Sequence, residues 1–212
     1  MTSVDSKDNR LTLLQANISS ILIQDMSLSE MLTLCSQALV EHLDAAFARI
    51  WTVNESEDVL ELQASAGMYT HTNGPHSRVP VGKFKIGLIA QERMPHLTNS
   101  VIGDPRVHDQ EWARREAMVS FAGYPLIVKD KLVGVLAMFS RVALPDTALD
   151  ALAVVTKYIG LGIQKKRVEE SLIDRDIRLR AALTQKNAFL LCSTKLSRWQ
   201  GSVLLRTPSK RR

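Results

Sequence analysis

The sequence contains only two cysteines, Cys35 and Cys192, and they lie far apart in a chain of 212 residues. Small secreted domains usually carry several cysteines that pair as disulfides, so this count speaks against a disulfide framework. Cys35 lies on the apolar face of an expected helix, where a packed, reduced thiol is usual. We therefore expect a cytoplasmic protein.

Long apolar runs are also missing. No stretch of 18 or more apolar residues occurs, whereas a membrane-spanning helix needs about 20. The first ten residues, MTSVDSKDNR, carry two acidic residues and lack the basic start and apolar run of a secretory signal. Neither a transmembrane segment nor a secretory leader is expected.

A spaced set of nucleophile, base or metal ligands is absent as well. The two most informative segments run from Val79 to Arg106 and from Phe121 to Ser140. The first combines glycine-containing turns with a short helix, and the second predicts two apolar strands joined at Lys129-Asp130. Because neither segment holds a catalytic constellation, we expect a binding and signalling module and not an enzyme.

Positive charge is unevenly distributed along the chain. Residues 1–164 hold 14 Lys+Arg against 18 Asp+Glu, a net charge of −4, whereas residues 165–212 hold 13 against 4, a net charge of +9. Basic extensions can bind nucleic acid or an anionic membrane. Aromatic residues such as Trp199 are sparse there, so a stacking platform for nucleic acid is not indicated. A solvated basic helix with a frayed end is favoured.

The first third of the chain predicts two helices and two strands. Apolar residues at helical spacing mark a helix over residues 11–25. Ser27 and Glu30 have the spacing of a capping box, which begins a second helix that ends near Leu43. Alternation with a period of two predicts strands over residues 46–53 and 59–64.

The remainder predicts a loop, short elements, two long strands and a long final helix. The loop, rich in His, Asn, Gly and Pro, covers residues 68–78. The long strands are almost continuously apolar, which favours a sheet covered on both faces. Pro145 and Asp146 open the final helix. The expected helices are 87–92 and 109–117, and the expected extended segments are 96–99, 118–128 and 132–141.

Apolar residues continue along the final helix at close to a seven-residue spacing. Arg175 and Lys186 interrupt this repeat, which favours a weak parallel coiled coil. Beyond Leu191 the period is lost, so a basic, disordered end is expected. The repeat consists of Val168, Leu172, Leu179, Ala182 and Phe189.

The order of these elements, together with a set of motifs, resembles the GAF domain family over about residues 25–172. The segment from Ile163 to Glu170 looks like the linker by which many GAF domains lead into PAS or histidine-kinase segments. The motifs are Val79-Pro80-Val81-Gly82, Ile86-Gly87, Ala90-Gln91, Pro95, Asp104-Pro105-Arg106, Tyr124-Pro125-Leu126 and Leu132-Val133-Gly134-Val135-Leu136.

The resemblance implies an α+β fold with an antiparallel sheet of five or six strands. The terminal helices would lie on one face, and a ligand pocket would lie on the other, beneath a lid at residues 82–92. The corresponding divisions are 1–26 (N-terminal helix or linker), 27–164 (GAF domain), 165–190 (signalling helix) and 191–212 (tail).

The candidate pocket residues leave two questions open. Arg49 and Trp51 share one face of the first strand. If that face lines the pocket, Arg49 offers an anion contact and Trp51 an apolar wall; if it meets the terminal helices, Arg49 must be paired or near an edge. Asp104 either binds a ligand or caps a turn while pairing with Arg106, and the cap is favoured. The full set is Arg49, Trp51, Phe84, Asp104, His108, Trp112 and Tyr124.

The cofactor is left open by the residues. Cyclic-nucleotide binding in GAF domains accompanies an Asn-Lys…Phe…Asp-Glu set, but no Lys follows Asn99. Covalent bilin attachment and the reduction of free methionine sulfoxide need pocket cysteines, and neither cysteine falls in a pocket-forming segment. Haem needs one histidine ligand, and spacing selects none of the four loop histidines, which are His71, His76, His96 and His108.

The resulting functional prediction is a small-molecule-sensing or regulatory domain of a bacterial signal-transduction protein. It would form a homodimer through its terminal helices and relay to an output domain or a partner such as a histidine kinase. Because no kinase output segment is visible, the chain either acts through a partner or is a truncated sensor kinase. The alternative is a ligand-free dimerisation platform whose pocket is filled by side chains.

Overall fold

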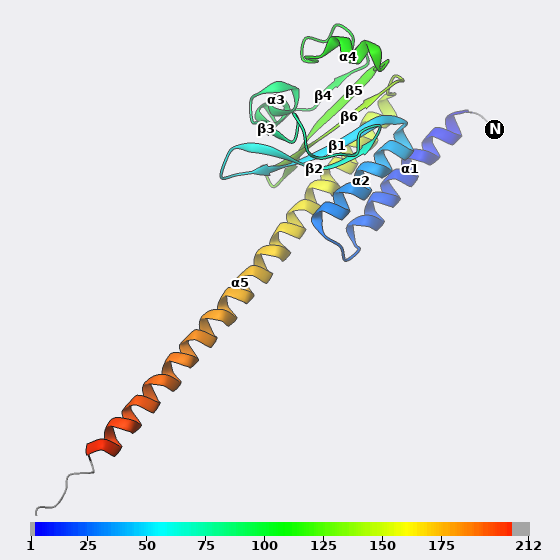
Figure 1. Cartoon of the computed structure of the whole chain (residues 1–212). Coiled ribbons are helices and arrows are strands. Elements are labelled where there is room, and N and C mark those ends of the chain that lie inside the picture. The colour runs from blue at the N-terminus through cyan, green and yellow to red at the C-terminus, as the bar shows by residue number, and fades with distance from the viewer. Residues whose placement is uncertain (1–2, 205–212) are drawn as a thin grey trace, which may run out of the picture. The chain divides into compact units, whose positions relative to one another are not determined.

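The computed structural model describes the backbone of residues 3–204 and the side chains of residues 9–186. It forms two compact units, Met1–Lys166 and Arg167–Arg212. The first unit is built on one six-stranded antiparallel sheet in the order β3-β2-β1-β6-β5-β4 (Figure 1), which confirms the predicted α+β fold. The strands are β1 (Ala45–Asn54), β2 (Val59–Gly67), β3 (Arg78–Pro80), β4 (His96–Thr98), β5 (Ser120–Val128) and β6 (Lys131–Ser140).

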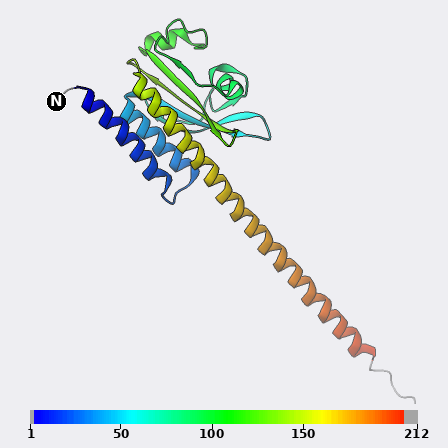
Figure 2. The same ribbon diagram turned by 180° about the vertical axis from the view of Figure 1, so that it is seen from behind.

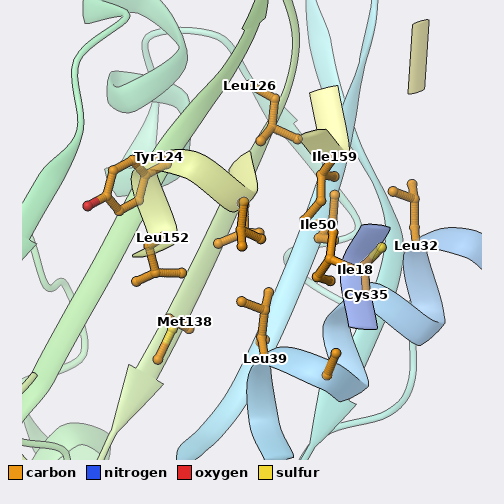
Figure 3. Close-up of a cluster of buried hydrophobic side chains, with 14 of the residues drawn as sticks. Ile18, Leu32, Cys35, Leu39, Ile50, Tyr124, Leu126, Met138, Leu152 and Ile159 are labelled. Atoms are coloured by element: carbon orange, nitrogen blue, oxygen red, sulfur yellow. The ribbon is translucent and has the colours of Figure 1, made fainter. Parts of the chain in front are cut away.

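Helices from the two ends of the first unit cover one face of the sheet, as expected. They are α1 (Ser3–Leu22), α2 (Leu28–Leu43) and the first part of α5 (Asp146–Leu204) (Figures 1 and 2). Their apolar stripes and the inward side chains of the strands form what we call the helix-side core (Figure 3). It includes Ile18, Leu32, Leu39, Ile50, Leu126, Leu136, Leu152 and Ile159, all with no exposed surface.

The opposite face carries a second core beneath α3 (Phe84–Glu92) and α4 (Gln110–Arg115). We call this face the lid side. Alternation along β1 divides the residues between the faces, because successive side chains of a strand point in opposite directions. Ala48 and Ile50 belong to the helix-side core, and Phe47 and Trp51 to the lid-side core.

The predicted capping box of α2 is confirmed in atomic detail. The Glu30 backbone N–H donates to Ser27 Oγ (3.2 Å), and the Ser27 N–H donates to Glu30 Oε2 (2.9 Å), which completes the capping box of α2. Gly87 permits a close approach of the backbone. A Cβ at that position would lie 2.2 Å from the Pro80 carbonyl oxygen, so only glycine lets α3 rest against β3.

The structure differs from the sequence-based expectations at three places. β3 was expected to be loop; it is a three-residue edge strand that pairs with β2. α1 begins at Ser3 and packs into the helix-side core, so it belongs to the first unit. α5 continues to Leu204 and not only to about residue 190, because a helix needs no apolar period to continue where proline is absent. None of the described helices is long and apolar enough to span a lipid bilayer.

Candidate functional site

The lid side contains a cluster of aromatic rings, which we call the aromatic cluster: Phe47, Tyr69, Trp112, Phe121 and Phe139. Phe47 stacks on Phe139 with ring centroids 5.3 Å apart and meets Tyr69 edge-on at the same distance. Phe139 also has edge contacts with Trp112 (5.2 Å) and Phe121 (4.8 Å). Such pairs stabilise a core beyond the area they bury.

Several elements position these rings. Phe47 and Phe139 are cross-strand partners in β1 and β6. Trp112 lies in α4, whose first turn is capped by Asp109 Oδ1 accepting from the Trp112 N–H (2.8 Å). Trp112 Nε1 donates to the Tyr69 hydroxyl (3.0 Å), so α4 is joined to the loop that follows β2.

Arg49 lies on the same face of β1 as the cluster and is only 9% exposed. Its Nε donates to Ser65 Oγ (3.2 Å), and its guanidinium carbon lies 5.4 Å from the ring centroids of both Phe47 and Tyr69. Burial lowers the pKa of Arg49. No carboxylate among the described residues forms a salt bridge with it, so its charge is balanced only by aromatic faces and a hydroxyl.

Trp51 holds the loop over residues 68–77 against the sheet. The ring is 3% exposed, and its Nε1 donates to the His76 carbonyl oxygen (2.9 Å). Ser65 makes a second tie, because its hydroxyl donates to the Tyr69 carbonyl oxygen (2.7 Å). The loop is therefore fixed near both of its ends by side chains of β1 and β2.

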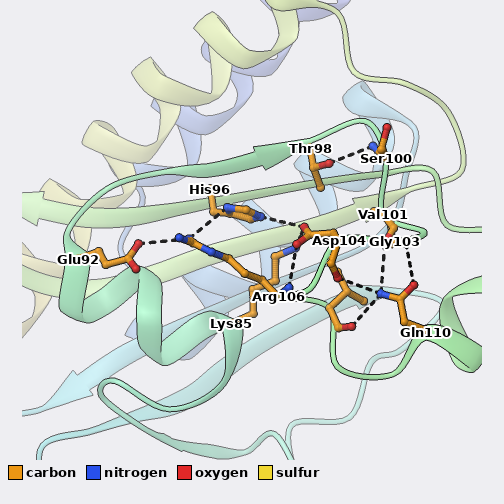
Figure 4. Close-up of polar contacts among 11 residues, drawn as sticks. Lys85, Glu92, His96, Thr98, Ser100, Val101, Gly103, Asp104, Arg106 and Gln110 are labelled. Carbon is orange, nitrogen blue, oxygen red and sulfur yellow. Dashed lines mark hydrogen bonds and ion pairs between the residues drawn. The ribbon is translucent and has the colours of Figure 1, made fainter.

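A polar network, which we call the lid network, joins α3, β4 and the loop after β4 (Figure 4). Asp104 Oδ2 accepts from Lys85 Nζ (2.9 Å) and pairs with His96 Nε2 (3.0 Å), while its Oδ1 accepts from the Arg106 backbone N–H (2.9 Å). Arg106 in turn pairs with Glu92 (3.2 Å). Lys85 Nζ also lies 3.8 Å from the centroid of the Phe121 ring, so the network borders the aromatic cluster.

Burial and pairing act in opposite directions on these charges. Burial by itself would raise the pKa of Asp104, but hydrogen bonds from His96, Lys85 and the Arg106 N–H lower it to about 2. Burial lowers the pKa of Lys85, and its contact with Asp104 opposes that effect. The side chains of both residues are only 8% exposed, so the pair is held largely out of water.

Gln110 organises the loop that carries Asp104. Its Nε2 donates to the carbonyl oxygens of Asp104 (3.0 Å) and Val107 (2.9 Å), and its Oε1 accepts from the Gly103 N–H (2.9 Å) (Figure 4). One amide side chain thus bonds to three backbone groups of this loop.

The structure brings together three of the seven candidate pocket residues. Arg49, Trp51 and Trp112 lie on the lid side, in or beside the aromatic cluster. Asp104 lies nearby, in the lid network, and caps its turn as favoured. The expected pairing of Arg106 with Asp104 is wrong for the side chain, which reaches Glu92.

The other three candidates lie apart from the aromatic cluster and the lid network. Tyr124 faces the helix-side core and donates its hydroxyl to the Leu149 carbonyl oxygen (3.0 Å), because even-numbered residues of β5 point away from the lid. Phe84 is 61% exposed at the start of α3, where its backbone has a left-handed φ of 54°. His108 is exposed before α4.

The candidate set missed several residues that build the site. Phe47 and Phe139 were assigned to strands without a role, and Tyr69 and Lys85 were not considered. Phe47 lies two residues before Arg49, so period-two alternation puts both on one face of the strand and makes Phe47 predictable from the sequence. Tyr69 gave no such signal, because its position depends on how a loop folds back.

The thiol of Cys35 is remote from this site. It lies in the helix-side core with no exposed surface, and burial raises its pKa to about 12. Such a thiol stays protonated and unreactive at neutral pH. The side chain of Cys192 lies outside the described residues.

Two cavities lie away from the aromatic cluster. One of about 80 Å³ is lined by the end of α2 and the connection from β6 to α5, among them Leu43 and Leu144. A more open one of about 420 Å³ lies beside α2 and includes Leu34. Neither includes Arg49 or a ring of the aromatic cluster.

An antiparallel sheet with terminal helices on one face and a tied lid on the other is the architecture of a small α+β domain. The family model for the GAF domain matches residues 25–164, and the chain belongs to this family. GAF domains are regulatory or sensor domains of signalling proteins.

Solved structures agree with this fold. The GAF domain of a phosphoenolpyruvate-protein phosphotransferase from Coxiella burnetii has a TM-score of 0.66 at 18% identity, covering 78% of this chain and 98% of that one. A putative GAF sensor protein from Burkholderia vietnamiensis has 0.61 at 21% (76% and 98% covered). Free methionine-R-sulfoxide reductase from Neisseria meningitidis, in complex with its substrate, has 0.61 at 17% (75% and 93% covered). No curated protein matches the chain.

Proposed function

We propose that the chain is a small-molecule-sensing regulatory domain of a bacterial signal-transduction protein. It binds its ligand on the lid side, forms a homodimer through its terminal helices, and relays the bound state to an output domain or a partner such as a histidine kinase. The observation that carries the sensing role is Arg49, a largely buried guanidinium that pairs with no carboxylate of residues 9–186 and lies beside partly exposed aromatic rings. Polar groups within an apolar, aromatic surround are typical of ligand sites.

The sheet packs against the lid on one face and against the terminal helices on the other, which supports the proposed relay of the ligand-bound state. β1 carries Phe47 and Arg49 on the lid side and Ala48 and Ile50 in the helix-side core. A ligand that displaces an aromatic ring therefore acts on a strand that also packs against the terminal helices, and tightly packed layers respond by small rigid shifts. α5 is the helix that carries such a shift onward.

Exposed apolar side chains on α5 support the dimer. Val168, Leu172 and Leu179 are 51%, 56% and 61% exposed, and their spacing places them on one side of the helix. Leu161 and Tyr158, 53% and 40% exposed, continue the same spacing toward the start of α5. A second copy of the chain would cover this seam.

Similarity to methionine sulfoxide reductases raises the question of catalysis. That chemistry uses thiolates, and the one described thiol is buried in the helix-side core. We therefore propose no catalytic role, and the expectation that the chain is not an enzyme stays a prediction.

The ligand-free platform is the second candidate function. It is favoured by the aromatic cluster, whose rings fill much of the lid side with side chains. In that case Arg49 would be a tolerated internal charge, and the domain would serve only to join two chains.

Native mass spectrometry of the full chain, purified gently from its own cells, tests the choice between sensor and platform. The sensor is expected to retain a small molecule at a fixed stoichiometry. Trp112→Ala should release it by opening the aromatic cluster, whereas Phe84→Ala, which removes an exposed ring at the lid, should not. Wild-type protein without a bound molecule, together with dimers that are unchanged in Trp112→Ala, would instead establish the platform.

A further inference from the structure

Arg49 carries a charge on the lid side that no acidic residue of the described chain neutralises. Its one side-chain hydrogen bond runs from Nε to Ser65 Oγ, so among residues 9–186 its two Nη groups have no hydrogen-bond partner. Guanidinium groups are rarely left unpaired in a protein interior, because removing a charge from water is costly unless an anion replaces the water.

The two Nη groups keep a route to the surface. Every fully buried side-chain nitrogen or oxygen in the described part of the chain has a hydrogen-bond partner. Since the Nη groups have none, they are not fully buried, although Arg49 as a whole is 9% exposed. Tyr69, Trp112 and Phe139 nearby are also only partly buried, so the accessible surface around the donors is aromatic.

The surroundings of the guanidinium define what it can bind. Phe47 and Tyr69 both lie 5.4 Å from its central carbon, a distance at which aromatic rings attract the cation. Partial burial, and then the nearby Arg49 charge, lower the pKa of His76. A single planar fork of N–H donors matches a carboxylate, which accepts two parallel hydrogen bonds.

We propose that the lid side binds a small aromatic carboxylate. The carboxylate accepts hydrogen bonds from the two Nη groups of Arg49, and the flat ring packs against Tyr69 and Trp112. The inference rests on the proposed sensing function and adds the chemical class of its ligand. One positive charge suits a monoanion, whereas a phosphate dianion would need further donors.

Binding of benzoate, and of benzamide as its neutral isostere, tests the ligand class in the full chain. Tryptophan fluorescence and ligand-observed NMR report binding, since Trp51 and Trp112 lie at the site. Benzoate should bind at least about tenfold more tightly than benzamide, a difference that one good charged contact supplies.

Two Arg49 variants and one control identify the donor. Arg49→Met should lower benzoate affinity about tenfold or more, leave benzamide binding unchanged, and raise the unfolding midpoint because the unpaired charge is gone. Arg49→Lys keeps the positive charge but lacks the planar pair of N–H donors, so it should retain part of the preference for benzoate over benzamide. This variant tests the role of Arg49 if Arg49→Met does not fold. Arg114→Met, on the exposed face of α4, should behave as wild type.

Equal affinities for benzoate and benzamide, unchanged benzoate binding in the Arg49 variants, or no binding of benzoate at about 10 mM would overturn the carboxylate class. The sensing function fails separately. If native mass spectra show a neutral or cationic molecule that Trp112→Ala releases, the sensing function would stand. Only the proposal that the ligand is an aromatic carboxylate would fail.

Discussion

Asp104 connects three segments of the lid through one carboxylate. Lys85 of α3, His96 of β4 and the Arg106 backbone N–H all converge on it. Because the pKa of Asp104 is about 2 in the folded chain and close to 4 in an unfolded one, its ionised form stabilises the fold. That contribution is complete above about pH 4 and is lost as the pH falls toward 2.

The Asp104→Asn variant tests this linkage. At neutral pH it should lower the free energy of unfolding by about 1–2 kcal/mol, and the difference from wild type should shrink as the pH falls from about 5 to 2. Urea denaturation at a series of pH values measures both. Asp130→Asn, at an exposed turn with φ of 62° that asparagine tolerates, is the control and should show no such convergence. A difference that stays constant with pH would contradict the role of the carboxylate.

Also at the residue scale, the sequence predicted the face on which a strand residue lies more reliably than the partner that its side chain contacts. Arg49 and Trp51 were placed on the correct shared face because alternation in a strand is local. The partner of Arg106 was assigned wrongly, since Glu92 reaches it only after α3 folds beside the loop. Lys85 was overlooked for the same reason: a lysine in a surface helix gives no sign in the sequence that it will be buried against Phe121.

At the scale of elements, α3 is held close to β3 by the absence of a side chain at Gly87. A Cβ there would lie 2.2 Å from the Pro80 carbonyl oxygen, which is backbone and has little freedom to move. α3 and its residue Lys85 would therefore have to shift together. Positioning of the lid thus depends on a glycine as well as on the lid network.

Gly87→Ala should lower the free energy of unfolding by about 1–3 kcal/mol, as overpacked substitutions do. Gly160→Ala is the matched control, because Gly160 is also helical and its added Cβ would meet first a Val128 methyl group at 3.2 Å. There the gain of about 1 kcal/mol in helix propensity offsets the crowding. Denaturant unfolding of both variants gives the comparison. Equal effects would show that α3 does not depend on close contact with β3.

Most elements could be predicted, and the missed strand β3 has a clear physical cause. The capping box of α2 and the strands β1, β2, β5 and β6 follow from spacing within a few residues. β3 was missed because a three-residue edge strand is defined by the strand it pairs with and not by its own pattern.

At the scale of the whole molecule, the proposed dimer would explain why apolar side chains of α5 are exposed in the isolated chain. Val168, Leu172 and Leu179 expose more than half of their surface. Apolar residues at this spacing are typical of a helix that packs against another helix.

The double variant Leu172→Glu/Leu179→Glu should therefore convert a dimer to a monomer in sedimentation velocity experiments, since four like charges would face one another in the seam. Ile177→Glu is the control. Ile177 is 60% exposed but lies on the other side of the helix, about 140° from Leu172 at 100° per residue. If the wild-type chain is a monomer, or if the double variant stays dimeric, the proposal that these α5 residues form the dimer interface would be contradicted.

By itself, the sequence determined the strands and the alternation of their side chains, because these depend on local periodicity, and its short motifs indicated the family, whose resemblance implied the antiparallel sheet. Only the tertiary structure decided which side chains meet on the lid side. Tyr69 and Trp112 are 43 residues apart and touch through one hydrogen bond, and Tyr124 was excluded only when its face was known. Contacts of this kind form when loops bring distant segments together, and no periodic pattern in the sequence predicts them.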